Sequence, residues 1–143
     1  MSEQLFQIAA KALIRNDQGD IFMLHVPKWG HVVDHWDLPG GRMDPNETFL
    51  QTLVRELDEE LGVKVKGVPA QMMGMLTNIT IPVGDKQYPL VYIIFEVELE
   101  KLDDIKLSRE TREFEYAWLS PEKAAKAMVH KFDKEFCELI AKL

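Results

Sequence analysis

The sequence has little of what marks secreted, membrane-bound or nucleic-acid-binding proteins. Cys137 is its one cysteine, so no disulfide can form within the chain, as is typical of a reducing compartment. No hydrophobic run approaches the roughly 20 residues of a membrane span. The start of the chain, Met1 to Gln4, lacks the basic and apolar regions of a signal peptide. We therefore expect a cytoplasmic protein without membrane association.

Basic residues are also scarce. Lysine and arginine together number 17 against 24 aspartates and glutamates, which gives a formal net charge of −7. Proteins that bind a nucleic-acid polymer need a basic surface, so this composition argues against a polymer as partner. A small anionic substrate is still compatible with the acidic balance if metal ions are bound, because a bound cation inverts the local field.

Hydrophobic residues are plentiful by contrast, at 46% of the chain, and can bury one sizeable core. The chain has no internal repeat or linker, so a single domain over residues 1–143 is expected. Strand-like apolar segments dominate its first and middle thirds: residues 6–15, 21–26, 36–38, 63–68, 72–81, 90–99 and 115–119. The first two should form a hairpin around the turn at 16–20, and the very hydrophobic run 90–99 should be a central strand.

Helical patterns occur in the middle and at the end of the chain. Asp44 is predicted to cap the first helix, with Pro45 in its first turn and Glu47 at the capping-box position. Ser120 followed by Pro121 predicts a second helix start. Apolar residues then recur at helical spacing and predict an amphipathic C-terminal helix: Phe132, Phe136, Leu139, Ile140 and Leu143. Cys137 falls in this pattern, which predicts a buried structural thiol. A mixed sheet with helices on its faces, an α/β fold, is the expected architecture.

The helix that ends before Gly62 carries two stripes of side chains at about 100° per residue. An apolar stripe is expected to face the core: Leu50, Leu53, Val54, Leu57 and Leu61. A neighbouring stripe holds three glutamates, Glu56, Glu59 and Glu60, which repel one another at this spacing. A cation among their oxygens would relieve the repulsion, and such hard ligands suit magnesium, calcium or manganese. Arg55, one turn before Glu59, is expected to orient the carboxylates from behind.

An acidic run on a helix is usually a solvated face, so the interpretation depends on the whole residue pattern around the glutamates. It consists of Gly41, five residues, Glu47, seven residues, and then Arg-Glu-aliphatic-X-Glu-Glu-X-Gly-aliphatic from Arg55 to Val63. This string resembles the signature of the Nudix hydrolase family at every defined position. The segment from Trp36 to Gly40, Trp-Asp-Leu-Pro-Gly, is also similar to the family's approach to that signature.

The resemblance implies a fold, a reaction and a set of roles. The fold would be an α/β/α sandwich with a mixed β-sheet. The reaction would be hydrolysis of a nucleoside diphosphate linked to another group, with Mg²⁺ or alternatively Mn²⁺. The metal-ligand and base cluster would be Glu56, Glu59 and Glu60. The carbonyl of Gly40 would be a further ligand, and Glu47 with Arg55 would form a supporting ion pair. Homodimers are common among similar proteins, so a homodimer is a further hypothesis.

Substrate contacts are predicted for three residues outside the glutamate stripe. Arg42 directly follows the glycine pair and is well placed to contact a phosphate. Lys11 interrupts an apolar strand, where it could meet a phosphate or, equally, lie in solvent at a sheet edge. Trp29 could stack on a nucleobase, and His31 or His35 in the same loop could assist proton transfer or bind phosphate. An ordinary surface loop is the alternative.

Many members of the family that this chain resembles use one more acidic residue from a later segment. Glu110, Glu113 and Glu115 are the candidates, with preference for the last two, and Glu115 is predicted as a metal ligand. The alternative is a solvated acidic stretch.

The predicted function is metal-assisted hydrolysis of a pyrophosphate bond. A (deoxy)nucleoside triphosphate is the leading substrate by subtraction, because features expected of ADP-ribose, dinucleoside polyphosphate and coenzyme A enzymes are missing. A nucleotide-sugar or ADP-ribose-type pyrophosphatase and a non-catalytic nucleotide sensor are the alternatives. Isomerisation of a prenyl diphosphate is disfavoured because Cys137 lies near the C-terminus, and a plain cation-binding domain because there is no EF-hand loop.

Overall fold

The strands of the protein form two sheets. The computed structural model of the chain describes residues 3–28, 33–107 and 114–143. The strands are β1 (Gln7–Ile14), β2 (Ile21–Val26), β3 (His35–Asp37), β4 (Gly40–Arg42), β5 (Val65–Val83), β6 (Lys86–Leu99) and β7 (Glu115–Leu119). The helices are α1 (Phe49–Leu61), the short 3-10 helix η1 (Leu102–Asp104), α2 (Pro121–Ala127) and α3 (Lys134–Ala141). Strand order is β4-β1-β6-β5 in one sheet and β3-β2-β7 in the other.

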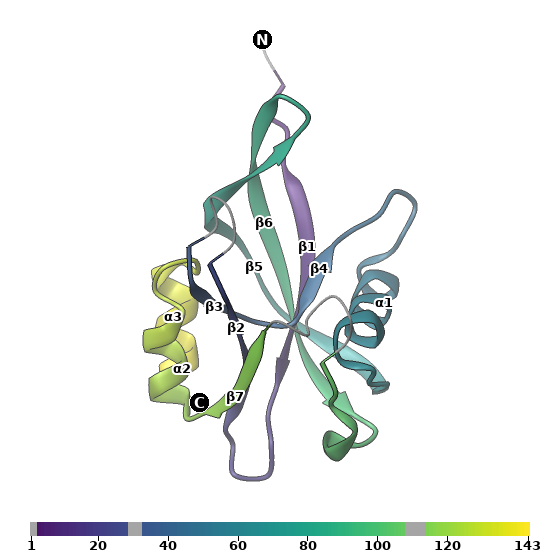
Figure 1. The fold of residues 1–143 in the computed structure, drawn as a ribbon, viewed down its shortest axis with the longest axis vertical. Coiled ribbons are helices and arrows are strands. Elements are labelled where there is room, and N and C mark those ends of the chain that lie inside the picture. The colour runs from purple at the N-terminus through teal and green to yellow at the C-terminus, as the bar shows by residue number, and fades with distance from the viewer. Residues whose placement is uncertain (1–2, 29–32, 108–113) are drawn as a thin grey trace.

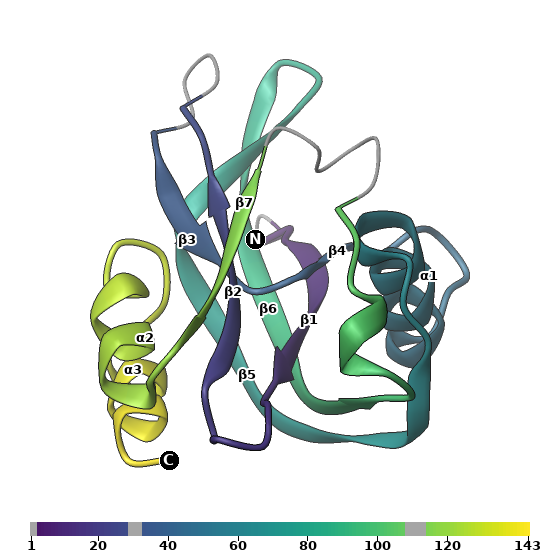
Figure 2. The same ribbon diagram turned by 60° about the horizontal axis from the view of Figure 1, so that its bottom comes forward.

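The first sheet is mixed and lies between layers of helices. β1 runs parallel to β6, whereas the β1–β4 and β5–β6 pairs are antiparallel. The second sheet is antiparallel, and its strands can be followed side by side in Figure 2. Figure 1 shows α1 on one side of the strands and α2 with α3 on the other. The predicted α/β/α sandwich with a mixed sheet is confirmed, and so is the central position of the strand at 90–99, which lies within β6.

Strand β1 is buried on both of its faces, and this is why helices cover both sides. Ala9 and Leu13 pack in a core cluster with α2 and α3. Ala10, Ala12 and Ile14, which alternate with them along the strand, pack in a second cluster with α1. The strand that borders the candidate site is therefore held from two sides.

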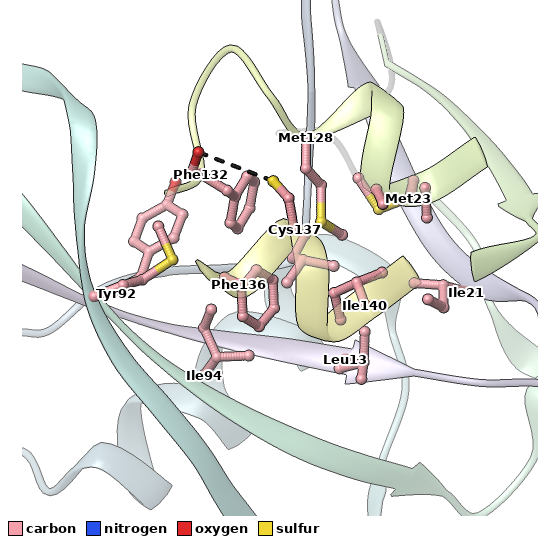
Figure 3. Close-up of a cluster of buried hydrophobic side chains, with 14 of the residues drawn as sticks. Leu13, Ile21, Met23, Tyr92, Ile94, Met128, Phe132, Phe136, Cys137 and Ile140 are labelled. Carbon is pink, nitrogen blue, oxygen red and sulfur yellow. Dashed lines mark hydrogen bonds between the residues drawn. The ribbon is translucent and has the colours of Figure 1, made fainter. Parts of the chain in front are cut away.

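The first core cluster contains the cysteine (Figure 3). Phe136 and Ile140 of α3 lie against the side chains of Leu13 and Ile94 from the sheet. Cys137 is buried beside them, with its thiol 4.0 Å from the carbonyl oxygen of Phe132. The prediction of a buried structural thiol is confirmed. Every helix in the described segments is too short or too polar to cross a lipid bilayer.

The predicted hairpin of the first two strands is wrong. A tight turn joins them, in which the Asn16 side chain accepts hydrogen bonds from the Gln18 and Asp20 N–H groups. Beyond one bridge between Arg15 and Ile21, β1 and β2 belong to different sheets. Both strands are apolar on both faces, so each can take a separate set of partners.

The two strands predicted at 63–68 and 72–81 are a single strand in the structure. This strand, β5, continues through three register shifts in its pairing with β6.

Helix α1 begins four residues later than predicted. Thr48, not Asp44, is the N-cap: its side chain accepts from the Gln51 N–H at 3.1 Å, and the Gln51 side chain accepts from the Thr48 N–H at 2.9 Å. Asn46 has a φ of 69°, which no helical residue adopts, so the preceding segment forms a turn instead. Glu47 therefore lies before the first residue of the helix, and its side chain accepts a hydrogen bond from Arg55 within it.

The core stripe of α1 is narrower than predicted. Leu53, Leu57 and Leu61 are fully buried, but Leu50 and Val54 are 39% and 45% exposed, so their assignment to the core is wrong. They lie at the edge of the stripe formed by the three buried leucines. Gly62 ends the helix as predicted, in the left-handed conformation with a φ of 64°.

The C-terminal helices begin where the sequence predicts a cap, and one more cap follows. Ser120 caps α2 with Pro121 in its first turn, as predicted. A second N-cap, Asp133, then starts α3, so the C-terminal pattern covers two helices. Phe136 and Ile140 face the core, whereas Leu139 and Leu143 are 38% and 41% exposed, so the predicted apolar stripe is partly wrong.

Candidate active site

The candidate site is built around a glycine strand. Gly40 and Gly41 are residues of β4 and pair with Lys11 and Ala10 of β1. Gly40 has a φ of 129°, and a Cβ atom there would lie 2.1 Å from the carbonyl oxygen of Ala10. A Cβ atom on Gly41 would lie 2.3 Å from the carboxyl carbon of Glu56. The backbone of β4 is therefore pressed between β1 and the glutamates of α1.

Glu60 is the most deeply buried of the helix glutamates. Its side chain accepts a hydrogen bond from the Gly40 N–H, with 2.7 Å between the nitrogen and Oε1. Burial raises its pKa to about 7, while the charge of Lys11 and the Gly40 hydrogen bond act against the rise. Burial also raises the pKa of Glu56, and Arg55 opposes this shift. Burial thus disfavours the charged form of two carboxyl groups that lie one helical turn apart.

Arg55 is the centre of the carboxylate cluster. Its Nε and Nη2 donate to the two carboxylate oxygens of Glu47, at 2.7 and 2.9 Å. Its Nη1 donates to Glu56 at 2.9 Å and to Glu59 at 3.3 Å, and Nη2 also donates to the carbonyl of Arg42 at 3.2 Å. A guanidinium has five N–H donors, so each of them has an acceptor here.

Glu47 connects the turn before the helix to this cluster. Besides its bonds with Arg55, its carboxylate accepts from the Asp44 N–H at 2.8 Å and from the Thr52 hydroxyl at 3.0 Å. The hydrogen bonds of Arg55 are the main reason that the pKa of Glu47 falls to about 2. Glu47 is therefore a fixed anion, and its role is to hold Arg55 rather than to exchange protons.

The donor chemistry at this position fits a hard divalent cation. Glu56 and Glu60 offer carboxylate oxygens and Gly40 a carbonyl oxygen, which are ligands that Mg²⁺ and Mn²⁺ prefer. Within the described part of the chain, no three acidic, histidine or cysteine side chains converge on one point. The Glu59 carboxylate, 42% exposed, accepts a hydrogen bond from Arg55. Burial raises the pKa of both Glu56 and Glu60, and a cation among their oxygens would favour the charged carboxylates.

Lys11 does not lie in solvent at a sheet edge, so that alternative is wrong. It is only 7% exposed. Its ammonium donates to Asp37 at 3.3 Å and to the carbonyls of Leu38 and Gly40, each at 3.1 Å. An ammonium has three N–H donors, and all three bond to protein acceptors. Its predicted contact with a phosphate would require one of these bonds to break.

Sequence reasoning missed the residues that surround Lys11. Asp37 also accepts from Lys131, 94 residues away in the chain, and from the Tyr92 hydroxyl. A buried charge normally has a partner, so the lysine in an apolar strand was a signal that an anion lies close to it. The identity of that anion depends on how the strands and helices pack, which local spacing does not encode.

The other predicted residues lie apart from the cluster or outside the described residues. Arg42 is exposed at the end of β4. The ring of His35 contacts the carbonyl of Val33. Glu115 is exposed in β7, opposite His25 of β2, whereas α1 packs against β4, β1 and β5. Their roles stay predictions. Four candidates lie outside the described residues: Trp29, His31, Glu110 and Glu113.

Comparison with known proteins places this geometry in a family. The NUDIX domain family model matches residues 5–140. The chain is 37% identical over 65 residues to an 8-oxo-dGTP diphosphatase of Proteus vulgaris, covering 46% of this chain and 57% of that one. It is 30% identical over 92 residues to an asymmetrical bis(5'-nucleosyl)-tetraphosphatase of Sus scrofa, covering 64% and 60%. The chain spans about half the length of the curated relatives it matches.

A solved structure agrees over nearly the whole chain. The MutT protein from Methanosarcina mazei Go1 is 28% identical with a TM-score of 0.67, and the superposition covers 99% of this chain and 95% of that one.

Proposed function

Because the chain belongs to the NUDIX family, we propose that it hydrolyses a pyrophosphate bond in a nucleoside triphosphate, with Mg²⁺ as cofactor. One observation carries this proposal. Arg55 donates hydrogen bonds to Glu47, Glu56 and Glu59. The Gly40 N–H donates to Glu60 and holds it against the glycine strand. Carboxylates arranged in this way beside a glycine backbone can bind a cation and accept a proton, and phosphoryl transfer to water needs both.

Different residues of the chain would bind the cation and orient its carboxylate ligands. Mg²⁺, or alternatively Mn²⁺, would be held by Glu56, Glu60 and the carbonyl of Gly40, with Glu59 and Glu115 as further candidate ligands. When bound, the cation supplies positive charge to the phosphate oxygens and the leaving group. Arg55 orients Glu56 through its hydrogen bond, and the Gly40 N–H orients Glu60.

The proton of the attacking water would go to Glu56 or Glu60. Both are carboxyl groups whose pKa is raised by burial, and this brings a carboxylate closer to the working pH of a general base. The charge of Glu56 adds to the rise in the pKa of Glu60, and the role of base is proposed for either of the two.

The choice of substrate rests on the named relatives. An 8-oxo-dGTP diphosphatase takes a deoxynucleoside triphosphate, and the 37% identity to one favours that class. The 30% identity to a bis(5'-nucleosyl)-tetraphosphatase favours a dinucleoside tetraphosphate as the second candidate. Arg42, Trp29 and Lys11 stay the proposed substrate contacts, and a homodimer stays the proposed assembly.

Removing the metal tests the reaction. With Mg²⁺, the protein should release a monophosphate and pyrophosphate from dGTP or 8-oxo-dGTP, and excess EDTA should lower the rate at least about 100-fold, because the cation is worth several kcal/mol. Adding back Mg²⁺ or Mn²⁺ should restore it. Chromatography would identify the products that are released. Diadenosine tetraphosphate, ADP-ribose and UDP-glucose would be tested as substrates in parallel. Turnover that survives EDTA, or nucleotide binding without turnover, would contradict the proposal, and the latter would favour a sensor.

The two glycines of β4 test the placement of the carboxylates. In Gly41→Ala the new methyl group meets the end of the Glu56 side chain, which can move. We expect a folded protein whose hydrolysis falls about 10- to 100-fold. In Gly40→Ala the methyl group meets the backbone of Ala10 at a φ of 129°, so the free energy of unfolding should fall by about 2 kcal/mol. Thermal melting and initial rates separate the two outcomes. Equal loss of stability in both variants would contradict this account.

A further inference from the structure

A buried charged network lies directly behind the glycine strand. Asp37 of β3 accepts hydrogen bonds on both carboxylate oxygens: on Oδ1 from the Leu38 N–H at 2.8 Å, and on Oδ2 from Lys131 at 2.5 Å and Lys11 at 3.3 Å. The Tyr92 hydroxyl also donates to Oδ2, at 3.0 Å. All the charged members are less than 9% exposed. Charges are costly to bury, so this network needs a reason beyond stability.

The network contains more positive than negative charge. Lys11 and Lys131 share one oxygen of one carboxylate, and both ammonium nitrogens also lie over the Tyr92 ring, 5.0 and 5.2 Å from its centroid. Tyr92 itself is held in the core against Phe132, as Figure 3 shows. Because an ammonium so placed cannot be satisfied by Asp37 alone, Lys11 must find its remaining acceptors elsewhere.

Those acceptors belong to the candidate metal centre. Lys11 donates to the carbonyls of Leu38 and Gly40, which flank the Pro39–Gly40 peptide. The N–H of that same peptide holds Glu60. One ammonium thus fixes both the proposed carbonyl ligand and the peptide that orients a proposed carboxylate ligand.

Lys131 and Lys11 donate to the same carboxylate oxygen of Asp37. The bond from Lys131 to Oδ2, at 2.5 Å, is the shorter of the two ammonium bonds, and Lys11 is left with the longer one at 3.3 Å. Without Lys131, this oxygen would attract Lys11 alone and draw it away from the Gly40 carbonyl. The backbone of Lys131 is held separately, since its carbonyl accepts from the Asn78 N–H at 2.9 Å. Its side chain can therefore be changed without releasing the segment between α2 and α3.

We propose that Lys131 is a positioning residue for the metal centre: by occupying Asp37, it keeps Lys11 on the carbonyl of Gly40. The effect would pass through Asp37 and Lys11, which the hydrogen bonds above connect to Lys131 and to the carbonyl of Gly40. This inference rests on the proposed function, since it concerns how the same site is kept in shape.

Metal binding without nucleotide tests the inference separately from turnover. Lys131→Met leaves one ammonium for one carboxylate, so the variant should fold, which circular dichroism would check. We expect its dissociation constant for Mn²⁺, read from the free-ion signal in electron paramagnetic resonance, to rise about tenfold. In the metal-free protein the amide resonance of Gly40 should also move. Lys131→Gln keeps a donor for Asp37 and should give a smaller change of the same sign, which also covers the case that the methionine variant fails to fold.

The control is Lys134→Met, three residues further on, where the side chain is 89% exposed. It should match the wild type in both measurements. A folded Lys131→Met with unchanged or tighter Mn²⁺ binding and an unmoved Gly40 resonance would overturn the inference. A wild type that binds Mn²⁺ and hydrolyses no nucleotide would overturn only the proposed function. A wild type that binds no Mn²⁺ would overturn both.

Discussion

Replacing Glu60 with glutamine is expected to lower nucleotide hydrolysis about 1000-fold while the protein stays folded. Glutamine keeps an oxygen that can accept the Gly40 hydrogen bond, so β4 and α1 should stay together. It lacks the negative charge that would bind a cation and the basicity that would accept a proton. Loss of a positioned acid–base group alone costs about 100- to 10,000-fold, and loss of a metal ligand adds to it.

The same substitution should stabilise the metal-free protein at neutral pH. Burial raises the pKa of Glu60 from 4.5 to about 7, so the folded state favours the protonated carboxyl. The stability that the protonated group contributes is fully present below about pH 4.5 and is lost as the pH rises through about 7. Glutamine resembles the protonated form at every pH. The difference in unfolding free energy between Glu60→Gln and the wild type should therefore grow between pH 4.5 and 7 in EDTA.

Asp58→Asn is the matched control for both measurements. Asp58 lies on the same helix and is exposed, and at about 100° per residue it falls outside the glutamate stripe. Its substitution should leave the hydrolysis rate and the urea midpoint close to the wild-type values. Two outcomes would assign Glu60 to the structural core and not to the active site. One is that Glu60→Gln keeps its activity within tenfold of the wild type, and the other is that it becomes less stable than the wild type as the pH rises.

The sequence predicts the glutamate stripe well because helical geometry fixes it. Residues three and four positions apart on a helix share a face whatever the rest of the chain does, so Glu56 and Glu60 lie together and Arg55 reaches Glu59. The start of the helix depends on one residue. Asn46 adopts a φ of 69°, which moves the N-cap from Asp44 to Thr48 and releases Glu47 to pair with Arg55. Asparagine tolerates this conformation, but its presence does not specify it.

Local sequence patterns do not predict the sheet pairing or the buried network, and the reason is different. A strand that is apolar on both faces, such as β1, gives no alternation from which its partners can be chosen. The turn at Asn16 suits a hairpin, yet β1 takes β4 and β6 as its neighbours. The ion pair of Asp37 with Lys131 bridges 94 positions and exists only because the segment between α2 and α3 packs against the sheet. Lys11 alone carried a sequence signal, as a charge in an apolar strand.

Asp37→Asn is expected to lower the free energy of unfolding by about 3 to 5 kcal/mol at pH 7. The shape of the side chain is kept, but Lys11 and Lys131 lose the anion that both contact. Removing one partner of a buried ion pair leaves an uncompensated charge, and here it leaves two. Urea denaturation should show the loss as a lower midpoint with an unchanged slope, and Asp58→Asn should stay within about 0.5 kcal/mol of the wild type.

The pH dependence of stability identifies the carboxylate as the cause. Burial alone would raise the pKa of Asp37, but Lys11 and Lys131 outweigh it and lower the pKa from 3.8 to about 2. A lowered carboxyl pKa contributes stability above about pH 3.8, which is lost as the pH falls toward 2. The wild type should lose stability over that interval, and Asp37→Asn should lose less.

A double variant separates the charge from the packing. In Asp37→Asn with Lys131→Met, one of the two uncompensated ammonium groups is removed together with the anion. Replacing both members of a buried pair is often close to neutral, so the double variant should be more stable than Asp37→Asn alone. If the two losses simply added, or if Asp37→Asn were as stable as the wild type at pH 7, the carboxylate would not be the counter-ion of the lysines. The arrangement proposed to hold the Gly40 carbonyl would then lack its electrostatic basis.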